Sequence, residues 1–326
     1  MSSELSLFKR IIKESNYDNT YKMAWARSLV ELSCELELNT DSVVITLEQI
    51  AEKYIKYYWN QTIFFNLMQG SNPNKPPVIV TLVKELIEEY YKAVGNNMPE
   101  LYERIIDKVL KVKMFKSYNK VLKKIATTLK YDVSWRFTFL DNKYNEEIYK
   151  YTKGNNELSI SKNLMLQLRD NEQDLYDLIN YRWGLILETF NSSPRINKKI
   201  KIMDEREIKR NSLDKFKKYL DLENEKHKCF ICGNRIEKEE LSVDHVIPWS
   251  YMYSDDIWNL VYVCKSCNSR KTNRIPDKAN IDKLKERNIR LLNRMNEENI
   301  KNKLVEELKL ANEKDYVTKF WIGSKN

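Results

Sequence analysis

Two Cys-x-x-Cys pairs constrain this chain more than any other feature of its sequence. Cys229 and Cys232 form the first pair, Cys264 and Cys267 form the second, and 31 residues lie between them. Four thiolates that converge from such pairs form a closed tetrahedral zinc site, which is structural because no ligand position stays open. The alternative, cysteines that are simply part of a core, does not explain this spacing. The intervening segment is longer than in a minimal zinc ribbon, so we expect it to carry a hairpin of its own.

The composition is that of a soluble globular protein that stays in the cytoplasm. The 326 residues suffice for two domains, and contents of 42% hydrophobic and 11% aromatic residues exclude a disordered chain. No apolar run reaches the roughly 18 residues of a membrane span, and the charged N-terminus lacks the apolar stretch of a signal peptide. In the reducing cytoplasm the paired cysteines are expected to bind metal rather than to form disulfides. The fifth cysteine, Cys34, is expected to be a small buried residue of a helix.

Positive charge is concentrated around the cysteine pairs. The net charge of +9 suits a partner made of phosphates. An AT-rich genome also favours lysine, so part of this excess can be mutational drift. Residues 195–274 nevertheless hold 18 basic and 13 acidic residues, and residues 265–274 hold four basic residues and no acidic one. The distribution therefore indicates that the cysteine-rich segment binds nucleic acid.

The whole chain is expected to be mainly α-helical with a small α+β portion. The first 130 residues show helical spacing of apolar residues, with an aromatic-rich helix at 47–65, and short strands are expected at about 134–161. We expect the aromatic residues at helical spacing to belong to the core rather than to a base-stacking surface. The expected domains are a helical N-terminal domain at 1–192, a basic connector at 193–228, the cysteine-rich module at 229–275 and a helical C-terminal segment at 276–326.

Asp244 and His245 are the candidate catalytic pair between the two cysteine pairs. Alternating apolar residues from 241 to 247, followed by Pro248, predict a strand. A lone histidine on a strand is usually structural, and neighbouring side chains of an ideal strand point to opposite faces. A bulge or bend would bring both to one site, where a carboxylate can ligate a divalent cation and an imidazole can accept a proton from water. The pair therefore fits phosphodiester hydrolysis.

Polar residues after Asp244 and His245 extend this candidate site. Asn268 follows Cys267, where a helix is expected to begin, so it is either a helix cap or, through its side-chain carbonyl, a second cation ligand. Arg270, Lys271 and Arg274 would project from that helix towards phosphates. Asn259 precedes the apolar run 260–263 that leads to the second cysteine pair.

The segment at about 229–275 resembles an HNH endonuclease domain, the ββα-metal nuclease fold of McrA-like restriction enzymes. The matching text is Cys-x-x-Cys at 229–232, Asp-His-x-Ile-Pro at 244–248, Asp-Asp-Ile-Trp-Asn-Leu at 255–260 and Cys-x-x-Cys-Asn-x-x-Lys at 264–271, in the order of the family. There are two departures. Position 268 is asparagine rather than histidine, and residues 249–253 replace the usual basic residue and glycine-rich turn, which bears on loop shape and nearby DNA contacts.

The resemblance implies a role for each matching residue. His245 would be the general base, and Asp244 and Asn268 would hold a catalytic Mg²⁺ or Mn²⁺ ion against the scissile phosphate. Asn259 would hold the loop and orient His245, Lys271 would contact a phosphate, and the four paired cysteines would bind a structural Zn²⁺. The products would carry 5′-phosphate and 3′-hydroxyl ends.

The leading interpretation is a metal-dependent DNA endonuclease from a bacterial or phage restriction, antiviral defence or mobile-element system. One alternative is a zinc-stabilised DNA-binding module without catalysis, which would have no use for Asp244, His245 and Asn268 together. A third interpretation, compatible with catalysis, makes the N-terminal domain a sensor that binds a regulatory protein or ligand and controls an effector nuclease. A double-strand break from one active site per chain would call for a homodimer or for two successive nicks.

Overall fold

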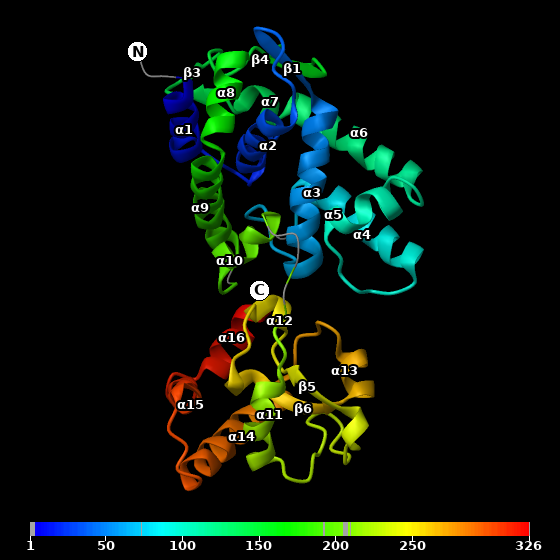
Figure 1. Ribbon diagram of the computed structural model, residues 1–326, viewed down its shortest axis with the longest axis vertical. Helices are drawn as coiled ribbons and strands as arrows, with labels where there is room; N and C mark the ends of the chain where they lie inside the picture. The colour runs from blue at the N-terminus through cyan, green and yellow to red at the C-terminus, as the bar shows by residue number, and fades with distance from the viewer. Residues whose placement is uncertain (1–3, 73, 192, 205–207, 209, 326) are drawn as a thin grey trace. The chain divides into compact units, whose positions relative to one another are not determined.

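Helices form most of the chain, and small antiparallel sheets join them (Figure 1). The computed structural model describes residues 4–72, 74–191, 193–204, 208 and 210–325. The expected fold class, mainly α with a small α+β portion, is confirmed. The chain divides into two compact units, unit 1 with Met1–Asn191 and Ile196–Ile208, and unit 2 with Ser192–Arg195 and Lys209–Asn326. No helix in the described parts of the chain is both long and apolar enough to cross a membrane.

Unit 1 is built from helices and two short antiparallel strand pairs, β1 with β4 and β2 with β3. Its first half contains α1 (Glu4–Glu14), α2 (Tyr21–Glu35), β1 (Ser42–Thr46), α3 (Leu47–Phe65), α4 (Val78–Val94), α5 (Tyr102–Ile105), the π-helix η1 (Ile106–Leu110) and α6 (Phe115–Tyr131). Its second half contains α7 (Val133–Arg136), β2 (Phe139–Leu140), β3 (Lys143–Tyr144), β4 (Glu157–Ser161), α8 (Lys162–Asp170), α9 (Glu172–Phe190), α10 (Ile196–Ile200) and the 3₁₀ helix η2 (Lys201–Met203).

The helix α3 shows how the local sequence sets the ends of an element. The Thr46 side chain accepts a hydrogen bond from the Gln49 N–H, and the Gln49 side chain accepts one from the Thr46 N–H, which together form a capping box. Asn66 ends the helix in the left-handed conformation, with φ at 47°. Four of its aromatic residues are fully buried, which confirms that they belong to the core: Tyr54, Tyr57, Tyr58 and Trp59. Phe64, near the end of the helix, is half-buried.

The strand β1 and the position of Cys34 differ from the prediction. β1 pairs with β4 in antiparallel register, with Val43 and Ile45 buried and Val44 exposed between them. The prediction that the first 130 residues are helical is therefore wrong at 42–46. A strand of five residues depends on its partner strand, and that partner lies far along the chain. Cys34 is exposed rather than buried, since it lies in the last turn of α2, where the helix leaves the core.

Unit 2 combines a hairpin with flanking helices. Its elements are α11 (Asp214–Glu223), the 3₁₀ helix η3 (Lys238–Glu240), β5 (Leu241–His245), α12 (Trp249–Met252), the 3₁₀ helix η4 (Ile257–Asn259), β6 (Leu260–Cys264), α13 (Lys265–Lys271), α14 (Lys278–Glu297), α15 (Lys303–Glu313) and α16 (Tyr316–Ser324). The strands β5 and β6 pair in antiparallel register from Leu241↔Cys264 to His245↔Leu260. The hairpin expected between the cysteine pairs is confirmed, and α13 packs on it (Figure 1).

One hydrophobic core joins the hairpin to the C-terminal helices. Trp258, which is 2% exposed, stacks on Phe320 with ring centroids 5.6 Å apart and meets the edge of Tyr316 at 6.1 Å. The indole N–H of Trp321 donates to the carbonyl oxygen of Pro276 at 2.7 Å. The C-terminal tail therefore docks on this core, and the helices after Pro276 share it with the hairpin.

Candidate functional site

The four paired cysteines converge on one point in unit 2. Their sulfur atoms all lie within 4.8 Å of one another. Cys229 and Cys267 are buried, Cys264 is half-buried and Cys232 is exposed. Gly233 makes the turn after the first pair possible, because its φ is 75° and its N–H donates to the Cys229 carbonyl oxygen at 2.8 Å. Four sulfur ligands at these distances fit a tetrahedral zinc ion.

Two of these thiols are perturbed in opposite directions. Burial raises the pKa of Cys229, but hydrogen bonds from backbone N–H groups, including Cys264 at 3.4 Å, outweigh it and lower the pKa to about 7. Burial, followed by the neighbouring thiols, raises the pKa of Cys267 to about 12. A bound dication compensates the charge of crowded thiolates, so this cluster suits a metal better than four free thiols.

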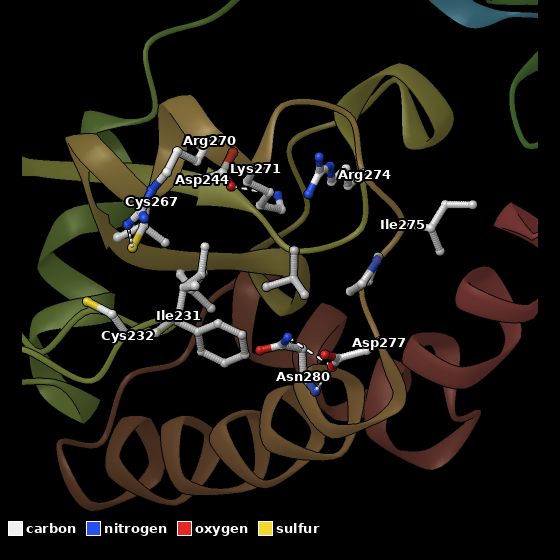
Figure 2. A pocket seen from close by; sticks show the side chains of 15 residues that line it. Ile231, Cys232, Asp244, Cys267, Arg270, Lys271, Arg274, Ile275, Asp277 and Asn280 are labelled. Atoms are coloured by element: carbon white, nitrogen blue, oxygen red, sulfur yellow. Dashed lines mark hydrogen bonds and ion pairs between the residues drawn. The ribbon is translucent and has the colours of Figure 1, made fainter.

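Asp244 lies on the face of β5 that α13 covers, beside a cavity of about 540 Å³. Figure 2 shows its carboxylate joined to the Lys271 ammonium, with 2.6 Å between Oδ2 and Nζ. The same ammonium donates to the backbone oxygen of His245. Lys271, expected at a DNA phosphate, thus contacts the carboxylate that is expected to ligate a cation.

Arg270 and Arg274 line the same cavity. Arg270 extends towards the zinc cluster, with Nη2 3.7 Å from Cys267 Sγ. The expectation that Arg274 projects from the helix is wrong, because α13 ends at Lys271 and Thr272 adopts a φ of 50°. Arg274 is nevertheless exposed beside the cavity. Three basic side chains therefore line this cavity, those of Arg270, Lys271 and Arg274.

Asn268 lies inside α13 rather than at its start. The helix begins at Lys265 with Cys264 as the capping residue, so the cap interpretation of Asn268 is wrong. Its Nδ2 donates to Ser242 Oγ at 3.2 Å. Ser242 shares a face of β5 with Asp244, and Asn268 is one helical turn from Lys271, so two matching contacts align the helix with the strand. Within the described residues, Asn268 Oδ1 has no hydrogen-bond donor, which leaves this oxygen available to a ligand.

His245 is the last residue of β5, and its ring lies against a different loop. Its Nε2 is 3.0 Å from Asp255 Oδ1, and the side chains of His245 and Asp255 are only 10% and 15% exposed. The expected bulge is absent from the described strand, because β5 and β6 pair regularly through His245↔Leu260. The chain bends only after His245. Asp244 and His245 therefore contact different partners, Lys271 and Asp255.

Asp255 is a site residue to which the sequence alone assigned no role. The hydrogen bond from His245 is the main cause that lowers the pKa of Asp255, and Asn211 and Lys215 lower it further. An ionised Asp255 can only accept a hydrogen bond, so Nε2 of His245 donates it, and Nδ1 is the ring nitrogen that does not face Asp255. The motif at 255–260 contains Asp255, but only its contact with His245 distinguishes it from its neighbour Asp256.

Asn259 is completely buried and fixes the bend that follows His245. Its Oδ1 accepts from the Ile247 N–H at 2.8 Å, and its Nδ2 donates to the Ile247 oxygen at 2.9 Å. Its backbone oxygen accepts from the Val246 N–H at 2.8 Å. These bonds hold the backbone next to His245, which is the geometry that the implied loop-holding role requires.

Residues 249–253 hold the short helix α12 and its capping residue Tyr253, where the family pattern has a glycine-rich turn. Tyr253 ends this helix in the left-handed conformation, with φ at 52°. The rings of Trp249 and Tyr253 meet edge to face at 4.9 Å, and the Arg210 guanidinium lies 4.5 Å from the Trp249 ring centroid. A packed aromatic pair thus shapes this loop.

Two family models match the chain. Residues 229–274 match the HNH endonuclease family. Residues 1–200, more than half of the chain, match a domain of unknown function, DUF8808. The chain belongs to the DUF8808 family. In this DUF8808 protein the HNH match confirms the resemblance seen in the sequence, and it supports nuclease activity with DNA as the substrate. No curated protein and no solved structure matches the chain.

Proposed function

We propose that this DUF8808 protein is a metal-dependent DNA endonuclease that leaves 5′-phosphate and 3′-hydroxyl ends. One observation carries the proposal: the hydrogen bond of 3.0 Å between His245 and Asp255. His245 is the last residue of β5, and Asp244 precedes it in the same strand. The match to the HNH endonuclease family supports the nuclease class.

His245 is the proposed general base. Because Asp255 accepts the hydrogen bond from Nε2, the free Nδ1 can take a proton from the attacking water. The same carboxylate holds the imidazole in one orientation and stabilises the positive charge that develops on it. Asp255 is thus a positioning residue.

Asp244 and Asn268 are the proposed ligands of a catalytic Mg²⁺ or Mn²⁺ ion. One carboxylate and one amide oxygen suit Mg²⁺, which keeps several waters and takes further ligands from substrate phosphates. A cation bound there would stabilise negative charge on the phosphate and on the leaving oxygen. The Lys271 ammonium has to release Asp244 for this, and it then joins Arg270 and Arg274 as a contact for DNA phosphates.

The scissile phosphate is placed at the C-terminal end of β5. Asp244 and His245 face different partners, yet they are adjacent in the chain, and β5 ends at His245. A phosphate at this end is within reach of both side chains. Asn259 keeps the following bend in place, so that the loop after β5 does not occupy the position of the substrate.

A second candidate function is a zinc-stabilised DNA-binding module without catalysis. The ion pair of 2.6 Å between Lys271 and Asp244 favours it, because a permanent contact would exclude a catalytic cation. Both functions use the zinc cluster and the basic cavity, and they differ only in cleavage.

For the wider role we propose a bacterial or phage restriction, antiviral defence or mobile-element system in the cytoplasm. The reducing cytoplasm would keep the four thiols available to zinc. Unit 1 would recognise the target or bind a regulatory partner, and a homodimer would supply two active sites for a double-strand break.

Plasmid cleavage by the full chain tests the proposal. Supercoiled DNA with Mg²⁺ or Mn²⁺ should become nicked or linear, and His245→Ala should abolish the reaction. The matched control is His227→Ala, because His227 is the other histidine and bonds Asp221 at 3.0 Å instead. The ends should be ligated without prior phosphorylation.

Undiminished cutting by His245→Ala would refute the role of the base. A wild-type protein that binds DNA and does not cut it under any of these conditions would establish the non-catalytic module instead.

A further inference from the structure

A second cavity, of about 370 Å³, lies within unit 1. It is formed by the loop between α1 and α2, the start of α2, α7 and the hairpin of β2 and β3, and its aromatic walls are Tyr17, Tyr21, Trp135, Phe139 and Tyr144. We propose that this cavity binds an unpaired nucleobase of DNA. The inference rests on the proposed function, which it deepens by assigning part of substrate recognition to unit 1.

Three of the rings form a continuous surface that water can reach. Phe139 and Tyr144 are 40% and 52% exposed, and Trp135 is half-buried. Phe139 and Tyr144 are paired across the hairpin with centroids 5.0 Å apart, and Tyr144 lies 5.9 Å from Trp135. Exposed apolar surface of this kind is unfavourable in water, and Tyr54, Tyr57, Tyr58 and Trp59 of α3 in the same unit are by contrast fully buried. Base stacking would cover these faces.

An ammonium and a carboxylate, those of Lys22 and Asp18, also line the cavity and attract each other. The Lys22 side chain is half-buried, and burial lowers its pKa. Within the part of the chain that the structure describes, the Lys22 ammonium and the Asp18 carboxylate form no hydrogen bond or ion pair. A nucleobase presents both donors and acceptors along its edge. An ammonium and a carboxylate that line one cavity can therefore bind such an edge.

Two cations lie beside the half-buried indole of Trp135. The Arg136 guanidinium lies 5.0 Å from the ring centroid and the Lys153 ammonium lies 4.6 Å from it. Arg136 is held in place by Asp132 at 2.9 Å. Proteins that bind single-stranded nucleic acid combine cations along the backbone with aromatic rings under the bases, and this cavity has both.

The ligand has to be an unpaired base because both faces of a base are covered inside a duplex. Proteins reach such a base only when it is single-stranded or flipped out of the stack. A purely apolar ligand would cover the rings but would offer no hydrogen bond to Lys22 or Asp18. The combination of open rings, polar groups and cations thus favours a nucleotide.

The test uses the full chain with His245→Ala, which prevents cleavage, in buffer without added Mg²⁺ or Mn²⁺. The probes are two short duplexes that differ only in one position, where 2-aminopurine is either paired or bulged. We expect tighter binding of the bulged probe and quenching of its fluorescence as the base stacks on the rings. Adding Tyr144→Ala should weaken binding of the bulged probe about tenfold and remove the quenching.

The matched control is Tyr181→Ala, because Tyr181 is 60% exposed on α9 and does not line the cavity. Lys22→Gln provides a second variant that leaves the rings in place, and melting curves by circular dichroism check that each variant folds. Equal affinity for paired and bulged probes, or equal effects of Tyr144→Ala and Tyr181→Ala, would overturn the proposal. Base-dependent binding by a wild-type protein that never cuts DNA would refute the nuclease function and support this site.

Discussion

Glu307 allows a quantitative test of how unit 2 holds the loop that follows the strand β5. Its Oε1 accepts a hydrogen bond from the Ile257 N–H at 2.9 Å, which secures the start of η4. Burial is the main cause that raises its pKa, and the nearby Asp256 raises it further, to about 7 from an ordinary value of 4.5. The folded protein therefore keeps a proton on Glu307 at pH values at which the unfolded chain has lost it.

The direction of the effect follows from proton linkage. Between pH 4.5 and about 7, Glu307 is protonated more often in the folded protein than in the unfolded chain. The free energy of unfolding therefore falls as pH rises through this window. One pKa unit corresponds to about 1.4 kcal/mol, which sets an upper limit of about 3 kcal/mol above the window. The side chain is only partly shielded from water, so we expect about 1–2 kcal/mol. Glu307→Gln retains the acceptor oxygen without the charge and should recover this amount.

Urea denaturation at several pH values, followed by tryptophan fluorescence, measures the difference. Glu307→Gln should match the wild type at about pH 4 and exceed it by about 1–2 kcal/mol at about pH 8. The matched control is Glu306→Gln, the exposed neighbour on α15, which should show no such dependence on pH. A Glu307→Gln protein no more stable than the wild type at about pH 8 would refute the argument that burial destabilises the ionised carboxylate.

Two further predictions concern the metals. Elemental analysis should find about one zinc per chain. The variant Cys267→Ser should lose this zinc and destabilise unit 2, whereas the control Cys34→Ser, at the exposed cysteine of unit 1, should keep it. Zinc retained by Cys267→Ser would exclude the site of four sulfur ligands. Lys271→Met should tighten Mn²⁺ binding to the DNA-free protein about fivefold, because the ion pair that competes with the cation contributes about 1 kcal/mol. Calorimetry measures this affinity. The control Arg274→Met removes the same charge from the same cavity and should leave the Mn²⁺ affinity unchanged. Equal Mn²⁺ affinity of these two variants would show that Lys271 does not compete with the cation.

Local features of the sequence were sufficient to predict much of unit 2. The spacing of the cysteine pairs predicted both the cluster of four sulfur atoms and the hairpin between them, since a metal cluster needs its ligands on two turns that a short element can bring together. The helix at 47–65 was predictable for the same reason, because its apolar periodicity and its cap lie within the helix itself. Its buried aromatic residues followed from that periodicity.

Only the tertiary structure decided which groups meet at the site. Periodicity indicates which face of an element is buried, and it does not indicate the element that covers this face. The contacts of His245 with Asp255, of Asp244 with Lys271, and of β1 with β4 all join residues that different turns and helices bring together. The sequence by itself determined the four-cysteine cluster and the candidate chemistry, because both rest on short spacings. The partners that orient His245, hold the Asp244 carboxylate and shape the aromatic cavity depend on packing between distant segments, and therefore on the fold.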